Sequence, residues 1–210
     1  RSTNGALWSP ENTTTAAAAT RPVGYSKTNW PASSAPHRWM VFDLDFATGK
    51  VRWVKEASGA PPDRAKHLKN SYASETPVTD GERVYVYFGA IGMVAALDFE
   101  GAVLWTKDTG TFNTMQAMAT ASSPALHEDR LYVLNDNTTQ SFLTALDTAT
   151  GEEVWRALDV VGEMGYGQPI IIEAGGVRQL IIWHPLAVSS LDPETGEVYW
   201  EQPFEVGYDM

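Results

Sequence analysis

Cysteine is absent from all 210 residues of the sequence. Its absence excludes thiol nucleophiles, cysteine-based zinc sites, dithiol redox pairs and disulfide bonds. It does not fix the cellular compartment, because exported proteins can also lack cysteine. Long apolar runs are missing as well, since no segment approaches the roughly 18 apolar residues of a membrane-spanning helix. We therefore expect no transmembrane segment in this chain.

Positive charge is scarce. The sequence has 15 Lys and Arg residues against 26 Asp and Glu residues, which gives a formal net charge of −11. A nucleic-acid partner is therefore not expected, because phosphate binding relies on clustered Lys and Arg. Docking on anionic lipid is disfavoured for the same reason. The remaining composition, 43% hydrophobic and 20% charged, is that of a soluble globular protein long enough to bury a core.

Residues 1–37 are rich in Ser, Thr, Asn, Ala and Pro and show no regular apolar period. We interpret them as a low-complexity arm or as an insertion between strands, and residues 38–210 as the folded region. The first residue is Arg1 rather than Met, so we expect a processed, truncated or incomplete chain.

An internal repeat begins at about residue 38. Its four copies are DLDFATGKVRW (43–53), ALDFEGAVLW (96–105), ALDTATGEEVW (145–155) and SLDPETGEVYW (190–200). In every copy a glycine precedes a tryptophan by four positions, in the pairs Gly49/Trp53, Gly101/Trp105, Gly151/Trp155 and Gly196/Trp200. The second copy is one residue shorter than the others. A register that is kept through all copies indicates a repeated structural unit.

Each copy is typical of two strands joined by a turn. The Asp after Leu can accept backbone N–H groups in the turn, and the Gly can adopt the left-handed conformation. Runs such as RVYVYFG, RLYVLND and QLIIWH are β-branched and aromatic, which favours strands. Before these runs, Pro77, Pro124 and Pro169 open a first strand, and Asp80-Gly81, Glu128-Asp129 and Gly175-Gly176 form the next turn.

The tryptophans are spaced by 52, 50 and 45 residues, so each unit holds about four short strands. This is the size of a β-propeller blade. We therefore predict an all-β fold, a β-propeller of four-stranded antiparallel blades, with about four blades in this chain. A solenoid of helix pairs is excluded, because no unit has an apolar period of 3.6 residues.

The pattern Ala-x-Asp-x-x-Thr-Gly-x-x-x-Trp, which residues 145–155 match at every specified position, resembles the tryptophan-docking motif of PQQ-like (quinoprotein-like) propellers. The stretch HLKNSYASETPVTDGERVYVYFG is similar to the bacterial PQQ-binding-like β-propeller repeat group. The resemblance implies that the tryptophan of each repeat packs between neighbouring blades. It gives Trp53, Trp105, Trp155 and Trp200, with Gly49, Gly101, Gly151 and Gly196, a structural role.

Members of this group usually run to about twice this length and close as seven or eight blades. The chain stops at EQPFEVGYDM, where a further blade is expected to begin. The resemblance therefore implies part of a seven- or eight-bladed propeller, or an open propeller, or one that closes by oligomerisation.

The loops that enter the innermost strand of each blade are the first candidate site. In the loop 66–75, the polar side chains of His67, Lys69, Asn70, Ser71 and Glu75 could bind a small ligand or a peptide. The preferred interpretation is that they hydrogen-bond one another and the neighbouring backbone. One His beside one carboxylate is not by itself an acid–base site.

Asn135, Asp136 and Asn137 follow a predicted strand and are a second candidate set. Oxygen ligands of this kind suit calcium. Adjacent residues alternate in direction along a strand, however, and three in a row seldom reach one ion. Turn capping is the preferred interpretation, and no metal site is assigned.

The leading functional hypothesis is a non-catalytic propeller scaffold that binds protein partners in a larger exported or envelope-associated assembly, in the periplasm or outside the cell. No catalytic residue and no cofactor is predicted. One alternative is a fragment of a PQQ-dependent alcohol or sugar dehydrogenase, for which the family implies PQQ and calcium. The missing cysteines, which many such enzymes carry beside the quinone, weaken that alternative. A second alternative is a glycan-binding propeller.

Overall fold

A computed structural model describes residues 37–62, 70–114, 118–160, 165–184 and 186–204. Of residues 1–37, for which an arm or an insertion between strands was expected, residues 1–36 lie outside the described residues. The described part of the chain contains no helix with the length and apolar character that crossing a membrane requires.

The described residues form four antiparallel sheets in chain order, which we number as blades 1 to 4. Blade 1 holds β1 (Trp39–Leu44) and β2 (Val51–Ser58). Blade 2 holds β3 (Val78–Thr79), β4 (Arg83–Phe88), β5 (Met93–Asp98) and β6 (Val103–Asp108), with a 3-10 turn η2 (Gly89–Ile91) between β4 and β5. Blade 3 holds β7 (Ala125–His127), β8 (Arg130–Asn135), β9 (Ser141–Asp147) and β10 (Glu153–Val160). Blade 4 holds β11 (Ile170–Ala174), β12 (Val177–His184), β13 (Ala187–Leu191) and β14 (Val198–Pro203).

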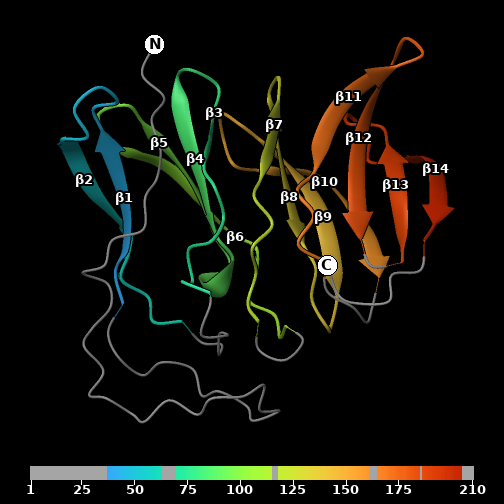
Figure 1. Ribbon diagram of the computed structural model, residues 1–210, viewed down its shortest axis with the longest axis horizontal. Coiled ribbons are helices and arrows are strands. Elements are labelled where there is room, and N and C mark those ends of the chain that lie inside the picture. Colours follow the sequence, from blue (N-terminus) through green and yellow to red (C-terminus); the bar gives the residue numbers. More distant parts are fainter. Residues whose placement is uncertain (1–36, 63–69, 115–117, 161–164, 185, 205–210) are drawn as a thin grey trace.

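The four sheets stand side by side in chain order, and each follows its strands in sequence from one edge to the other (Figure 1). This is the blade arrangement of a β-propeller. The prediction of an all-β propeller of antiparallel blades is confirmed, and each predicted opening proline comes directly before β3, β7 or β11. Blade 1 differs from the other three, because the described residues supply only two of its strands.

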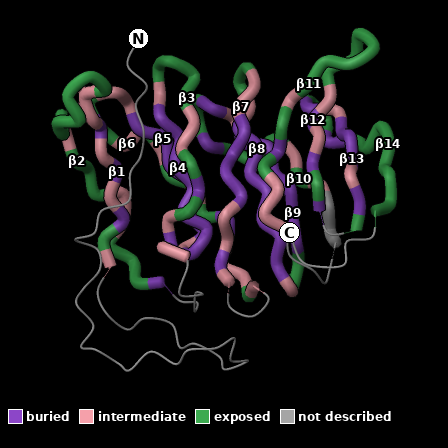
Figure 2. The backbone as a smooth tube through the Cα atoms, in the orientation of Figure 1, coloured by how far each residue is buried: buried purple, intermediate pink, exposed green. Residues whose placement is uncertain are grey.

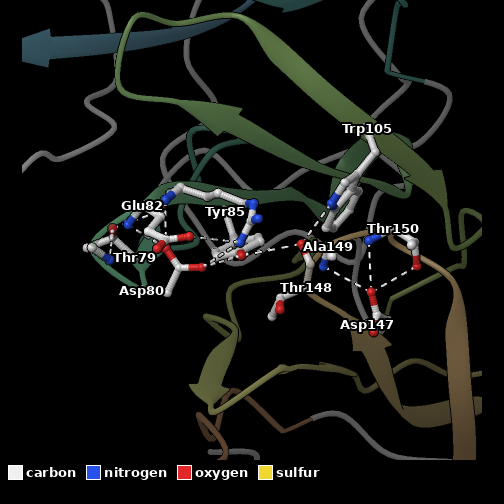
Figure 3. Close-up of polar contacts among 11 residues, drawn as sticks. Thr79, Asp80, Glu82, Tyr85, Trp105, Asp147, Thr148, Ala149 and Thr150 are labelled. Carbon is white, nitrogen blue, oxygen red and sulfur yellow. Dashed lines mark hydrogen bonds and ion pairs between the residues drawn. The ribbon is translucent and has the colours of Figure 1, made fainter.

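The repeated turn has the same geometry wherever it has its full length. In blade 3, Asp147 N donates to Glu152 O and Gly151 N donates to Asp147 O, both at 2.8 Å. The carboxylate Oδ1 of Asp147 accepts from the backbone N–H and the hydroxyl of Thr150, at 2.8 and 2.9 Å (Figure 3). Gly151 has φ +74°, a conformation that residues with a Cβ rarely adopt. The turn therefore forms from its own sequence.

The apolar core lies between blades rather than within one. Three clusters of buried side chains fill the contacts of blade 1 with blade 2, of blade 2 with blade 3, and of blade 3 with blade 4. Buried residues accordingly lie along the middle strands of blades 2 and 3, whereas every residue of β14 is exposed (Figure 2). Each blade is stabilised by its neighbours, because a single sheet cannot bury both of its faces.

Antiparallel strands divide the turns between two ends of the molecule. The repeated Asp–Gly turns lie at one end, together with the turns that join the first two strands of a blade. We call this the turn end. The crossovers between blades and the turns that join the second and third strands lie at the other end, which we call the crossover end. The turn end carries the contacts of the tryptophans, and the crossover end carries the candidate polar residues.

Candidate functional site

Three of the four repeat tryptophans bond to the next blade. The indole Nε1 of Trp53 donates to Phe99 O at 2.7 Å, that of Trp105 to Thr148 O at 2.9 Å, and that of Trp155 to Pro193 O at 3.0 Å. In each case the acceptor is the carbonyl of the residue after the Asp of the next repeated turn. The outer strand of one blade is thereby bonded to the turn of the following blade.

The glycine of the next turn lies under the indole ring. A Cβ built on Gly151 would stand 2.5 Å from Trp105 Cε3, and one built on Gly196 would stand 2.7 Å from Trp155 Cε3. Real Cβ atoms do not approach so closely, so only glycine leaves room for the ring. The same residue type thus serves both the left-handed turn and the contact between blades.

A tyrosine in the second strand of blades 2 and 3 supports this contact. Tyr85 packs against Trp105 with ring centroids 6.0 Å apart, and Tyr132 packs against Trp155 at 5.9 Å. The hydroxyl of Tyr85 donates to Asp80 Oδ2 at 2.6 Å and lies 3.4 Å from Thr148 O (Figure 3). Burial raises the pKa of Tyr85 to about 12. The sequence signal for this role is the pattern Arg-x-Tyr-Val, which is repeated at the start of β4 and of β8.

Trp200 is placed differently from the other three tryptophans. Its Nε1 donates at 3.1 Å to Gln179 Oε1 of its own blade, and 45% of its surface is exposed. The described residues contain no blade beyond it.

At the crossover end, Glu75 lies buried between blades 2 and 3. Its Oε1 accepts from Thr120 Oγ1 at 2.6 Å and from Gly89 N at 3.3 Å, and its Oε2 has no partner among the described residues. Burial raises the pKa of Glu75 to about 7, although these hydrogen bonds favour the charged form. The carboxyl therefore ties the crossover that follows blade 2 to the turn between β4 and β5.

The neighbouring candidates in the same loop are engaged by the protein itself. Asn70 Nδ2 donates to Thr120 O at 3.1 Å, and Asn70 Oδ1 accepts from Tyr72 N at 2.7 Å. Ser71 Oγ accepts from Ala73 N at 3.2 Å. The structure thus brings Asn70 and Glu75 together on Thr120, a residue that sequence reasoning did not single out. His67 and Lys69 lie outside the described residues.

The second candidate set begins a polar chain that joins blade 3 to blade 2. Asn135 Nδ2 donates to the hydroxyl of Tyr87 at 2.6 Å. Tyr87 also hydrogen-bonds Thr109, whose own hydroxyl donates to Gly92 O at 2.9 Å. Burial, with the nearby charge of Glu75, raises the pKa of Tyr87. Tyr87 was not singled out either, since its partners lie far away along the chain.

Asn137 holds the turn between β8 and β9. Its Oδ1 accepts from Thr139 N and Gln140 N at 2.8 and 2.7 Å, and its Nδ2 donates to Asn135 Oδ1 at 3.1 Å. The amide oxygens of Asn135 and Asn137 are therefore used by protein donors. No group of three His, Asp or Glu side chains within the described ranges could hold a metal ion.

Asp136 also contacts this network, through a hydrogen bond with the side chain of Ser141. Its carboxylate accepts from the backbone N–H of Gly165, while Oδ2 has no partner among the described residues. Burial raises the pKa of Asp136 to about 7. Two buried carboxyls, Glu75 and Asp136, thus sit at successive contacts between blades.

Comparison with a protein-family model gives a match over residues 37–207, to the model described as "Outer membrane protein assembly factor BamB". A comparison with curated protein sequences found no match.

Among solved structures, the chain is similar to quinohemoprotein alcohol dehydrogenase ADHIIG from Pseudomonas putida HK5, with 17% identity, a TM-score of 0.56, and coverage of 83% of this chain and 32% of that chain. It is also similar to quinohemoprotein alcohol dehydrogenase from Comamonas testosteroni, with 15% identity, a TM-score of 0.52, and coverage of 84% and 35%. BamB from Moraxella catarrhalis matches with 17% identity, a TM-score of 0.48, and coverage of 82% and 44%.

The chain spans less than half the length of each of these structures. At such identities the two dehydrogenase matches show the shared propeller fold and nothing finer. The family model, in contrast, covers the whole array of described blades. The chain therefore belongs to the family of PQQ-like β-propeller proteins whose model is described as outer membrane protein assembly factor BamB.

Proposed function

We propose that this chain is a non-catalytic propeller scaffold that binds protein partners in an exported or envelope-associated complex, in the periplasm or outside the cell. Two observations support it. The family carries the description of an assembly factor. The candidate polar residues that the structure describes at the crossover end bond to backbone and to other side chains of the protein, as the contacts of Glu75 and Asn137 show. We propose further that the contacts of Trp53, Trp105 and Trp155 are tryptophan docking, which holds the blades in order so that they present one continuous surface.

The observation that carries the proposal is a row of exposed apolar side chains on the outer strands. Leu104, Val154 and Tyr199 each come directly before a repeat tryptophan, and each is exposed. They lie on β6, β10 and β14, the strands at the outer edge of blades 2, 3 and 4. An edge strand offers unpaired backbone groups, and an apolar side chain beside them favours an extended or apolar protein segment.

The test is site-specific photocrosslinking in cells that produce the protein natively. A photoreactive residue at position 104 or 154 is expected to give a protein adduct, and the same residue at position 106 a much weaker one. Thr106 is the matched control, because it is exposed on the same strand but polar. Protein adducts of equal yield at positions 104 and 106, or no adduct at either position, would contradict the proposal.

The alternative hypothesis is a fragment of a PQQ-dependent dehydrogenase, and the shared fold of the two alcohol dehydrogenases supports it. Under that hypothesis a divalent ion would be held beside the quinone. The described residues do not fit it, since the oxygens of Asn135 and Asn137 accept protein hydrogen bonds and no group of three acidic or His side chains converges there. Oxidation of an alcohol by the purified protein with added PQQ and calcium would restore this hypothesis.

A further inference from the structure

We propose that the crossover end is a pH-sensitive switch: ionisation of Glu75 and of Asp136 releases the crossovers that lead to blades 3 and 4, while the tryptophan contacts keep the blades joined at the turn end. The proposal goes beyond the scaffold function and does not depend on it, because it rests on contacts within the chain. The crossovers and the repeated turns lie at opposite ends of the blades (Figure 1).

Each of the two carboxyls holds the crossover that leads to the next blade. Glu75 Oε1 accepts from Thr120 Oγ1 at 2.6 Å, and Thr120 belongs to the crossover from blade 2 to blade 3. The carboxylate of Asp136 accepts from the N–H of Gly165, in the crossover from blade 3 to blade 4. A change in either carboxyl therefore acts directly on the segment that enters the next blade.

Both carboxyls lie where a negative charge is costly. Glu75 is 8% exposed and Asp136 is 5% exposed, and each has one oxygen without a partner among the described residues. The donors that do bond to them are hydroxyls and backbone N–H groups rather than cations. A buried carboxyl with such partners favours its protonated form, because burial penalises the charge. Burial accordingly raises the pKa of each group to about 7.

The backbone on both sides of the contact between Glu75 and Thr120 is strained. Tyr72 has φ +70° and Ala119 has φ +64°, left-handed conformations that residues with a Cβ rarely adopt. Ala119 directly precedes Thr120, and its N–H donates to Thr114 Oγ1 at 2.8 Å. Such strain persists only where the surrounding contacts maintain it. Loss of the bond from Thr120 to Glu75 would therefore allow the crossover to relax, which favours opening.

The tryptophan contacts at the turn end are made by groups that do not titrate near neutral pH. Trp105 Nε1 donates to Thr148 O, and Trp155 Nε1 donates to Pro193 O. Neither an indole N–H nor a backbone carbonyl changes charge in this range. Tyr85, which packs against Trp105, has a pKa of about 12. We therefore expect the blades to stay joined at the turn end when the crossover end opens.

The other titratable groups that the structure describes near these contacts keep their charge between pH 6.5 and 8.5. Tyr87 on β4 faces Glu75, and its raised pKa keeps it neutral. Arg156 on β10 acts on Tyr87 and stays charged, as arginines do. In blade 4, burial lowers the pKa of His184 below 6.5, so its ring stays neutral above that pH. A change at the crossover end within this range therefore arises at Glu75 and Asp136.

The experiment is hydrogen exchange of single backbone amides in the purified 210-residue chain at pH 6.5 and at pH 8.5. Each exchange rate is divided by the rate of the unfolded chain at the same pH, which gives the protection of that amide. Thr76 reports on the contact of Glu75, since its N–H donates to Ser123 Oγ of the next crossover at 2.8 Å. Gly165 reports on the contact of Asp136.

The protection of Thr76 and of Gly165 is expected to fall roughly fourfold from pH 6.5 to pH 8.5, the change that follows when a carboxyl with a pKa of about 7 regains its ordinary pKa on opening. The protection of Gly151, which lies under the ring of Trp105, is expected to stay the same.

Two isosteric variants separate the contacts. Glu75→Gln is expected to remove the pH dependence at Thr76 and to leave it at Gly165, and Asp136→Asn is expected to do the reverse. Each variant is thus the control for the other, and unchanged protection at Gly151 establishes that both are folded.

Equal protection of Thr76 and Gly165 at the two pH values in the parent chain would overturn the proposal. So would an equal loss of protection at Gly151, because the whole array would then be opening rather than one end. Persistence of the pH dependence at Thr76 in Glu75→Gln would also overturn it. None of these outcomes bears on photocrosslinking at position 104, so the scaffold proposal and this one can fail separately.

Discussion

Glu75 is a carboxyl group enclosed between two blades, with one oxygen bonded to Thr120 and the other without a partner among the described residues. Burial raises its pKa from 4.5 to about 7. The folded protein therefore holds a proton on Glu75 more tightly than the unfolded chain does. The contribution of Glu75 to the free energy of unfolding is fully present below about pH 4.5, and it is lost as the pH rises through 7.

Glu75→Gln is expected to remove this loss, since the amide imitates the protonated acid and cannot ionise. The variant should be more stable than the parent at pH 8, by roughly a few kcal/mol at most, and little changed at pH 5. Urea unfolding at the two pH values measures the difference, with the exposed Glu82→Gln as control. Some pH dependence is expected to remain, because Asp136 has its pKa raised in the same way. A Glu75→Gln variant that loses as much stability as the parent between pH 5 and pH 8 would contradict this explanation.

Two glycines with the same backbone conformation allow the contact between blades to be measured. Gly49→Ala and Gly151→Ala both place a Cβ at positive φ, which costs about 1–2 kcal/mol. At Gly151 the Cβ would also strike the ring of Trp105, so an additional cost of roughly 1–3 kcal/mol is expected. Denaturant unfolding of dilute protein gives both values. Equal destabilisation by the two substitutions would show that the ring contact contributes nothing.

In blades 1 to 3 the outer strand is the element that joins the blade to the next one. β6 carries Trp105 to the turn that follows β9, and β10 carries Trp155 to the turn that follows β13. Each contact combines a half-buried ring, one hydrogen bond and a glycine that leaves room for the ring. Because the same elements recur, the array is stabilised by nearest-neighbour contacts between blades.

Trp105→Ala is expected to cost roughly 3–5 kcal/mol, because it removes a packed aromatic and leaves the carbonyl of Thr148 without its indole donor. Trp200→Ala should cost about 1 kcal/mol, since much of its surface already meets water in the single chain. Guanidinium unfolding of dilute protein compares the two. If both substitutions cost the same, the tryptophans would not be acting through the next blade.

The strands and turns could be predicted from sequence because their causes are local. Asp147 accepts hydrogen bonds from the N–H groups two and three residues ahead, and Gly151, four residues ahead, adopts the left-handed backbone conformation. The partners of the site residues could not be predicted in this way. Glu75 meets Thr120 across 45 residues, and Tyr87 meets Asn135 across 48. Only the stacking of one blade on the next brings such residues together, and no short sequence pattern encodes it.

At the scale of the whole molecule, the described chain is an array with two unlike ends. One end presents the open turn at Gly49, and the other presents the exposed face around Trp200. The sequence predicted about four blades from four repeats, and the residues that the structure describes form three four-stranded sheets and one two-stranded sheet. The count of repeats does not give the number of strands in a blade, because the repeat itself marks only the last two strands of each blade.

Native mass spectrometry of the protein purified from its natural cell envelope, followed by denaturation in the same run, tests the proposed scaffold function most directly. We expect a chain of 23.0 kDa or a longer form of it, released on denaturation from a heavier complex that contains other proteins. A chain that carries a small-molecule adduct, is free of protein partners and turns over an alcohol would contradict it.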